Sequence, residues 1–137
     1  MPTNYVLKNA QLADGSVQDI QIQDAKIVAV GKSLRADETI DCTGLVALPG
    51  FVDLHTHLRE PGFEQSETVL TGTQSGALGG FTAVHAMANT MPVADTAGVV
   101  EQVASLGKEA GYADVYPIGA VTVGLEGKQL AELGAMA

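Results

Sequence analysis

Two histidines, one residue apart, stand where a short apolar run ends, in the segment GFVDLHTHLREPG from Gly50 to Gly62. Because side chains alternate along a strand, this spacing predicts that Asp53, His55 and His57 project to the same face. Two neutral imidazoles in that arrangement can bind one metal ion, and Zn²⁺ suits such ligands. Asp53 could then orient a ligand as a hydrogen-bond acceptor. The competing interpretation is an ordinary polar strand end, because His-x-His alone is a weak signal.

Two more polar residues favour the metal interpretation and suggest an anionic ligand. Arg59 follows in a loop with Pro61 and Gly62, and a guanidinium binds carboxylate in a bidentate manner. Asn89 follows the next expected strand, and the carboxyl ends of parallel strands are where α/β folds place their chemistry. Its amide can donate to an anion. The alternatives are a solvated loop arginine and an asparagine that forms a turn before Pro92.

The third histidine, His85, lies inside the apolar segment FTAVHAMA. Its neighbours are apolar, and it lies inside the expected strand that precedes Asn89. We therefore expect a core histidine with a hydrogen-bond partner rather than a third metal ligand.

The second part of the chain alternates strands with helices. The expected strands are FVDLH, FTAVHAMA and DVYPIGAVTV. The first helix is expected over residues 67–78, capped by Ser66, and the second is expected to be capped by Asp95 and to end at Gly111. A third helix begins in EGKQLAELGAMA. This order implies a parallel sheet with right-handed crossovers. A closed (β/α)₈ barrel needs about 250 residues, so only three of its units fit here.

The first 48 residues show short alternating strands separated by turn signals instead. Asp14-Gly15 is a hairpin signal, Ile20 and Ile22 alternate with polar residues, and Asp24-Ala25 forms a further turn. ETIDC and LVALPG are read as two more strands. We predict an antiparallel β-module over residues 1–48, the N-terminal part of a β-sandwich-like module. Residues 49–137 are expected to form the first part of a (β/α)₈ barrel, so the fold class is α/β.

Composition restricts the partners. The formal net charge is −9, which argues against nucleic acid and anionic membranes as ligands. Cys42 is the only cysteine, so no internal disulfide forms, as suits a reducing, cytoplasmic location. The N-terminus does not resemble a signal peptide. The uncharged stretch 68–94 contains several glycines and a proline, so we expect the buried middle of a soluble protein rather than a membrane span.

The segment GFVDLHTHLREPGFEQSETVLTGTQSGALGGFTAVHAMANTMPV strongly resembles the opening of dihydroorotases of the bacterial cyclic-amidohydrolase type. LREPG together with MANT is the discriminating pair of motifs. Allantoinases and dihydropyrimidinases share His-x-His but usually lack both this arginine and this asparagine. The resemblance covers the whole chain, as an N-terminal β-module and the first three barrel strands of a metal-dependent TIM-barrel hydrolase.

The resemblance implies a zinc enzyme that interconverts L-dihydroorotate and N-carbamoyl-L-aspartate in de novo pyrimidine biosynthesis. His55 and His57 would be zinc ligands, with Asp53 behind them and one or two zinc ions in a complete active site. Arg59 and Asn89 would bind the substrate carboxylate. The resemblance further implies a homo-oligomer, with aspartate transcarbamoylase as a candidate partner.

Two departures from the family pattern limit this expectation. Ala88 stands where many relatives have proline. The family's bridging lysine carbamate or aspartate, two further histidines and catalytic aspartate all come later than Ala137. We therefore expect an N-terminal fragment that holds no catalytic residue and is inactive alone. The alternatives are a non-catalytic dihydroorotase-like scaffold for a transcarbamoylase, and a related cyclic amidase such as a hydantoinase, dihydropyrimidinase or allantoinase.

Overall fold

A computed structural model describes residues 4–137, and the chain divides into two compact units. The first unit ends at Pro49 and the second begins at Gly50, one residue after the boundary expected from sequence. None of the helices within residues 4–137 has the length and apolar character needed to cross a membrane.

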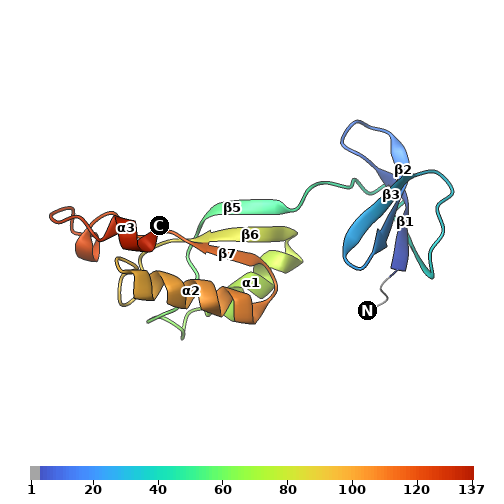
Figure 1. Cartoon of the computed structure of the whole chain (residues 1–137). Coiled ribbons are helices and arrows are strands. Elements are labelled where there is room, and N and C mark those ends of the chain that lie inside the picture. Colours follow the sequence, from blue (N-terminus) through green and yellow to red (C-terminus); the bar gives the residue numbers. More distant parts are fainter. Residues whose placement is uncertain (1–3) are drawn as a thin grey trace. The chain divides into compact units, whose positions relative to one another are not determined.

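The first unit is a four-stranded sheet of order β3-β2-β1-β4 (Figure 1). Its strands are β1 (Asn4–Gln11), β2 (Val17–Gln23), β3 (Lys26–Gly31) and β4 (Glu38–Asp41). The pairs β1–β2 and β2–β3 are antiparallel as predicted, but β4 pairs with β1 in parallel. The fully antiparallel expectation is therefore wrong, because the chain after β3 crosses to the opposite edge of the sheet. LVALPG is not a strand either, since only Val46 forms an isolated bridge there.

The β2–β3 turn follows its sequence signal. Asp24 and Ala25 both have positive φ, at 49° and 59°, as a two-residue type I′ hairpin turn requires. The small core of this unit contains Val6, which is fully buried, and the cluster of Ala10, Ile20 and Cys42 with partly buried neighbours around it.

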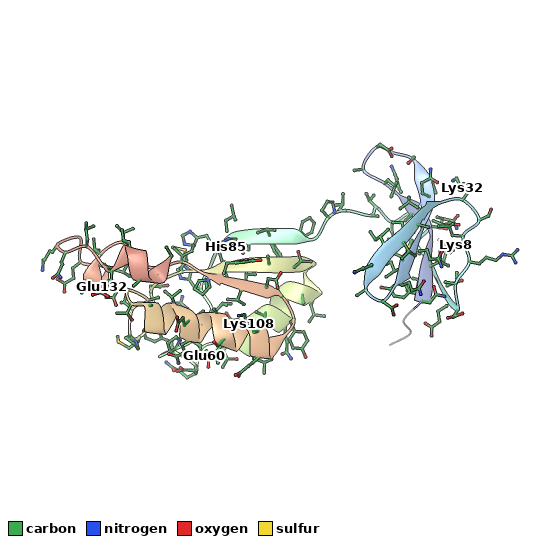
Figure 2. All side chains as sticks on the ribbon, viewed as in Figure 1. Lys8, Lys32, Glu60, His85, Lys108 and Glu132 are labelled. Carbon is green, nitrogen blue, oxygen red and sulfur yellow. The ribbon has the colours of Figure 1, made fainter. Side chains whose placement is uncertain are left out.

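Asp19 ties the strands of the first unit together through its buried carboxylate. It accepts hydrogen bonds from Lys8 Nζ at 2.8 Å and from the backbone amides of Asn9 and Leu34 at 3.1 Å each. Lys8 is labelled in Figure 2. The hydrogen bond from Lys8, followed by that from Asn9, lowers the pKa of Asp19. Its charge thus links β2 to β1 and to the segment that precedes β4.

The second unit is a parallel sheet of order β5-β6-β7 with both long helices on one face (Figure 1). The strands are β5 (Phe51–Thr56), β6 (Phe81–Ala86) and β7 (Asp114–Pro117). The helices are α1 (Val69–Leu78) and α2 (Ala97–Ala110), followed by the short η1 (Val123–Leu125) and α3 (Leu133–Met136). The predicted alternation and parallel pairing are confirmed, although the third strand and third helix are shorter than expected.

The core of the second unit lies between the sheet and its two helices. It consists of the buried side chains of Leu58, Val69, Val84, Ala86 and Val103. No described helix of the second unit covers the other sheet face (Figure 1), and apolar side chains on it are accessible to solvent. Leu54 is 68% exposed and Val52 is 51% exposed. Parallel sheets normally bury both faces, so an exposed apolar face on such a sheet is unusual.

Both helix starts differ from the sequence expectation. Thr68, not Ser66, caps α1, in a capping box in which its hydroxyl accepts from the Thr71 amide and Thr71 Oγ1 accepts from the Thr68 amide. Asp95 does not cap α2, because its carboxylate accepts from the Gly124 amide instead, and Thr96 at the N-cap position makes no side-chain cap bond. The predicted end of α2 at Gly111 is confirmed by its left-handed φ of 69°.

Two glycines of α2 provide a matched test of helix–sheet packing. A Cβ on Gly107 would lie 2.5 Å from Val115 Cβ, whereas a Cβ on Gly98 would meet nothing within 4 Å. Gly107→Ala should therefore lower the free energy of unfolding by about 1–3 kcal/mol through overpacking. Gly98→Ala should raise it, by up to about 1 kcal/mol, because alanine favours helix. Urea unfolding followed by far-UV circular dichroism measures both, and a stabilising Gly107→Ala would contradict the packing described.

Candidate functional site

The carboxyl end of β5 contains a bulge that decides which side chains share a face. Asp53 pairs with Val84 and Thr56 with Ala86, so β5 advances by three residues while β6 advances by two. Val84 and Ala86 belong to the helix-facing core, and Asp53 and Thr56 line a recess against α1. The expectation that Asp53 shares a face with His55 is therefore wrong, because strict alternation does not survive the bulge.

Asp53 nevertheless contacts the histidine segment through the backbone. Its Oδ1 accepts a hydrogen bond from the His55 amide at 2.9 Å, and this bond is the main reason that the pKa of Asp53 is lowered. The carboxylate thus fixes the backbone at His55. The sequence predicts instead that it accepts a hydrogen bond from the ring of a metal ligand. The His55 and His57 rings lie 5.2 Å apart between centroids, edge to face.

Asn89 fixes the orientation of His57. The Nδ1 atom of His57 lies 2.7 Å from Oδ1 of Asn89. An amide oxygen only accepts hydrogen bonds, so Nδ1 carries the proton, and in the neutral ring Nε2 then keeps its lone pair. Metal-binding histidines commonly donate their second ring N–H in this way, which sets the tautomer that can bind metal. The Asn89 side chain keeps its NH₂ group for another acceptor.

His57 and Asn89 also line a common hollow of about 220 Å³, together with Met87, Ala88 and Leu125; we call it the site hollow. His57 follows β5, Met87 to Asn89 follow β6, and Leu125 lies beyond β7. The hollow is therefore at the carboxyl edge of the parallel sheet, where the sequence predicted the chemistry. Sequence reasoning missed Leu125, because only a contact between distant loops brings it there.

Arg59 stands apart from this hollow, since it is not among the lining residues. It is exposed and has a left-handed φ of 63°. The ion pairs among residues 4–137 are Lys8–Asp19 and Lys128–Glu126, so no described carboxylate pairs with its guanidinium. The structure thus places the His57 ring in contact with both His55 and Asn89. The Arg59 side chain, two residues after His57, is exposed to solvent.

The loop that carries Arg59 is nevertheless held at both ends of its turn. Glu60 Oε2 accepts from the Val69 amide at 2.8 Å, at the start of α1. Gly62 packs so closely on Met91 that a Cβ would lie 2.4 Å from Met91 Cβ, and the Met91 amide donates to Pro61 O at 2.9 Å. The loops after β5 and β6 are therefore fixed to each other.

His85, labelled in Figure 2, has the hydrogen-bond partner that the sequence led us to expect. Its Nδ1 lies 3.3 Å from Asp53 O, and its ring stacks on Tyr116 with centroids 5.3 Å apart. It is partly buried rather than part of the helix-covered core.

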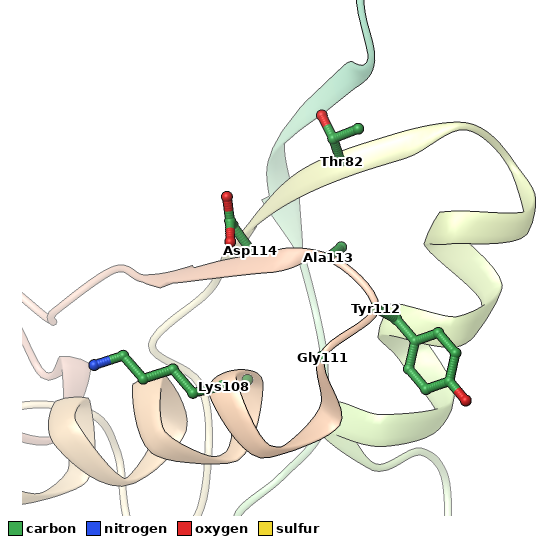
Figure 3. Close-up of a pocket in the computed structure, with 7 residues that line it drawn as sticks. Thr82, Lys108, Gly111, Tyr112, Ala113 and Asp114 are labelled. Atoms are coloured by element: carbon green, nitrogen blue, oxygen red, sulfur yellow. The ribbon is translucent and has the colours of Figure 1, made fainter. Parts of the chain in front are cut away.

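A second hollow, of about 380 Å³, lies at the opposite edge of the sheet (Figure 3). Thr82 and Asp114 stand at the amino ends of β6 and β7, and Lys108 and Tyr112 come from the end of α2 and the turn after it. Because parallel α/β folds place their chemistry at the carboxyl ends of strands, this hollow is not the candidate site.

The described residues do not form a complete set of ligands of the kind that catalytic zinc usually has. Within residues 4–137 no group of three or more His, Cys, Asp or Glu side chains could hold a metal ion. His55 and His57 fit as two nitrogen ligands of the type that zinc prefers, whereas catalytic zinc usually has three protein ligands.

Comparison with known proteins gives the family. A family model described as dihydro-orotase-like matches residues 44–137. The chain belongs to this family. It is 67% identical to a dihydroorotase of Leifsonia xyli subsp. xyli over 97% of this chain, and 62% identical to one of Streptomyces coelicolor over 96%. In both cases the match spans only 31% of the relative's length.

The solved structures agree on the fold and on the broad class of chemistry. An L-hydantoinase (dihydropyrimidinase) from Arthrobacter aurescens superposes with a TM-score of 0.75 and 25% sequence identity. The match covers 88% of this chain and 28% of that one. The dihydro-orotase-like family to which this chain belongs is thus one of cyclic amide hydrolases.

The role of Asn89 in holding the His57 tautomer can be measured without any ligand. Above pH 8, where histidine is neutral, ¹⁵N-detected imidazole spectra should show His57 protonated mainly at Nδ1. Asn89→Ala should convert this to a mixture of tautomers, whereas Asn89→Asp, which keeps an acceptor, should not. His85 serves as an internal control because its partner is the Asp53 carbonyl. An unchanged His57 pattern in Asn89→Ala would refute the assignment.

Proposed function

We propose that the chain carries part of the active site of a zinc-dependent dihydroorotase, which reversibly hydrolyses L-dihydroorotate to N-carbamoyl-L-aspartate in de novo pyrimidine biosynthesis. The observation that carries the proposal is the 2.7 Å contact between His57 and Asn89 at the carboxyl edge of a parallel sheet. In this proposal the second unit provides the first three βα units of a (β/α)₈ barrel, and membership of the dihydro-orotase-like family supports it.

His55 and His57 would hold the metal, the latter through the Nε2 atom that its bond to Asn89 leaves free. Zinc supplies Lewis acidity, which polarises an amide carbonyl and makes water a stronger nucleophile near neutral pH. The two imidazoles of this chain are compatible with one or two zinc ions in a complete site. Asp53 supports the arrangement through the His55 amide.

Arg59 and Asn89 would bind the substrate carboxylate. The chain carries a net charge of −9, so an anionic substrate needs a local cation to offset the repulsion. Arg59 has no carboxylate partner among the described residues, and its loop is fixed against the loop that carries Asn89. The NH₂ group of Asn89 can donate to the same carboxylate while its oxygen accepts from His57.

The chain by itself should be inactive. Two imidazoles fall short of the three protein ligands typical of catalytic zinc, and the chain spans about 31% of the length of its curated relatives. The remaining ligands and the catalytic aspartate would come from outside residues 1–137. A homo-oligomer, a transcarbamoylase partner and a cytoplasmic location are further expectations from the family.

A second candidate is a hydantoinase-type cyclic amidase, which the superposition on the L-hydantoinase favours. Hydantoins and dihydropyrimidines lack the ring carboxylate of dihydroorotate, so Arg59 would have no ligand group to bind. The two candidates therefore differ in what they require of Arg59.

Zinc titration of the purified chain tests the metal ligands. Binding should be weak, because the ligand set is partial, and should weaken at least about tenfold in His55→Ala and in His57→Ala, since each removes one of two nitrogens. His85→Ala is the matched control and should leave the affinity unchanged. Zinc affinity that depends on His85 but not on His57 would reject the proposed site.

Arg59→Met separates the two substrates. In NMR titrations of the zinc-loaded chain, the dissociation constant for L-dihydroorotate should rise about tenfold or more, because a charge-assisted hydrogen bond is lost. Binding of hydantoin, tested in parallel, should not change. Arg35→Met, at an exposed position of the first unit, controls for loss of positive charge. Equal affinity of the wild type and Arg59→Met for dihydroorotate would favour the hydantoinase interpretation.

A further inference from the structure

The segment 121–131, which we call the 121–131 loop, forms a closed loop after β7. Thr122 and Leu130 form an antiparallel bridge at its base. The Val123 amide donates to Gln129 O at 2.9 Å, and the Ala131 amide donates to Val121 O at 3.0 Å. The base of the loop is therefore fixed, while most of its residues are exposed.

A carboxylate from the preceding connection fixes the tip of the 121–131 loop. Asp95 Oδ2 accepts from the Gly124 amide at 2.7 Å, and the Ala120 amide donates to Ala94 O at the same distance. Asp95 stands one residue before Thr96, the N-cap position of α2, and its carboxylate does not cap the helix. Its carboxylate instead binds the Gly124 amide, which lies 29 residues later in the sequence.

The residue next to this contact has an unusual backbone. Leu125 has a φ of 61°, directly after Gly124 with a φ of 60°. Leucine rarely adopts the left-handed region, and such residues persist only where surrounding contacts determine them, often at functional sites. Leu125 is also the residue of this loop that lines the site hollow with His57 and Asn89.

We propose that Asp95 is a positioning residue for the candidate site: through the Gly124 amide it holds Leu125 as an apolar wall beside His57 and Asn89. Leu125 is 50% exposed, so it forms one side of the hollow and offers a nonpolar contact to a ligand held beside His57 and Asn89. As a statement about substrate, the inference rests on the proposed function: the hollow would take a small cyclic acid whose ring edge faces Leu125 and whose carboxylate faces Asn89.

Limited trypsin digestion tests the positioning role in the chain as it stands. Lys128 lies in the 121–131 loop and Lys108 lies in α2, and both are exposed. Asp95→Ala should raise cleavage after Lys128 about fivefold or more relative to cleavage after Lys108, because loops that lose their fixing contacts open more often. Asp95→Asn keeps an acceptor oxygen and should restore the wild-type ratio. An unchanged ratio, or an equal rise at both lysines, would overturn the proposal.

Two NMR measurements keep the test independent of how well the variant folds. In the wild type, the Gly124 amide should be protected from hydrogen exchange, and a Leu125 methyl should show a nuclear Overhauser effect to the Asn89 side-chain amide. The latter should disappear in Asp95→Ala and return in Asp95→Asn. An unprotected Gly124 amide in the wild type would overturn the proposal. None of these readouts requires turnover, so the positioning role of Asp95 can be confirmed even if the dihydroorotase assignment fails. Conversely, the assignment can be correct even if Asp95 does not position Leu125.

Discussion

The hydrogen bond between His57 and Asn89 joins two strands that are separated by a helix in sequence, and the candidate site depends on it. At 2.7 Å it connects the loop after β5 to the loop after β6 and assigns the ring proton to Nδ1. His57 and Asn89 therefore line the same hollow, held in a fixed relation by this bond. Among residues 4–137, this is the hydrogen bond that orients the His57 ring.

The rest of the second unit supports that contact. The core packs α1 and α2 against the sheet. The parallel register of β5 and β6 then brings the carboxyl ends of these strands to one edge. Gly62 then packs on Met91, which leaves no space for a side chain and fixes the two loops together. The Asp95–Gly124 contact adds the loop after β7. Three consecutive connections thus meet at one edge, although no group of three or more potential metal ligands is found within residues 4–137.

Local patterns predicted the parts of the structure that local physics decides. The period of the apolar residues predicted the alternation of strands and helices. Gly111 ends α2 as expected, and Asp24-Ala25 forms the expected turn. The pairing of His-x-His with Asn89 followed from the rule that parallel strands end at one edge. The role of each site residue remains a prediction, since no ligand contact tests it.

The errors came from non-local contacts. The bulge in β5 moves Asp53 away from the face of His55, and it depends on the register with β6 rather than on its own sequence. The position of Asp95 in the sequence indicates a helix cap, but its carboxylate accepts a hydrogen bond from the Gly124 amide, 29 residues later. Likewise, β4 turned out parallel to β1 because of how the chain crosses the sheet, which no turn signal records.

A crystal structure of the chain grown with zinc would test the central claim most directly. The account predicts one zinc ion within about 2.0–2.1 Å of a nitrogen on each of His55 and His57, with His57 binding through Nε2 while Nδ1 still contacts Asn89. Zinc bound elsewhere, or a His57 ring flipped so that Nδ1 binds the metal and the Asn89 contact is lost, would contradict it.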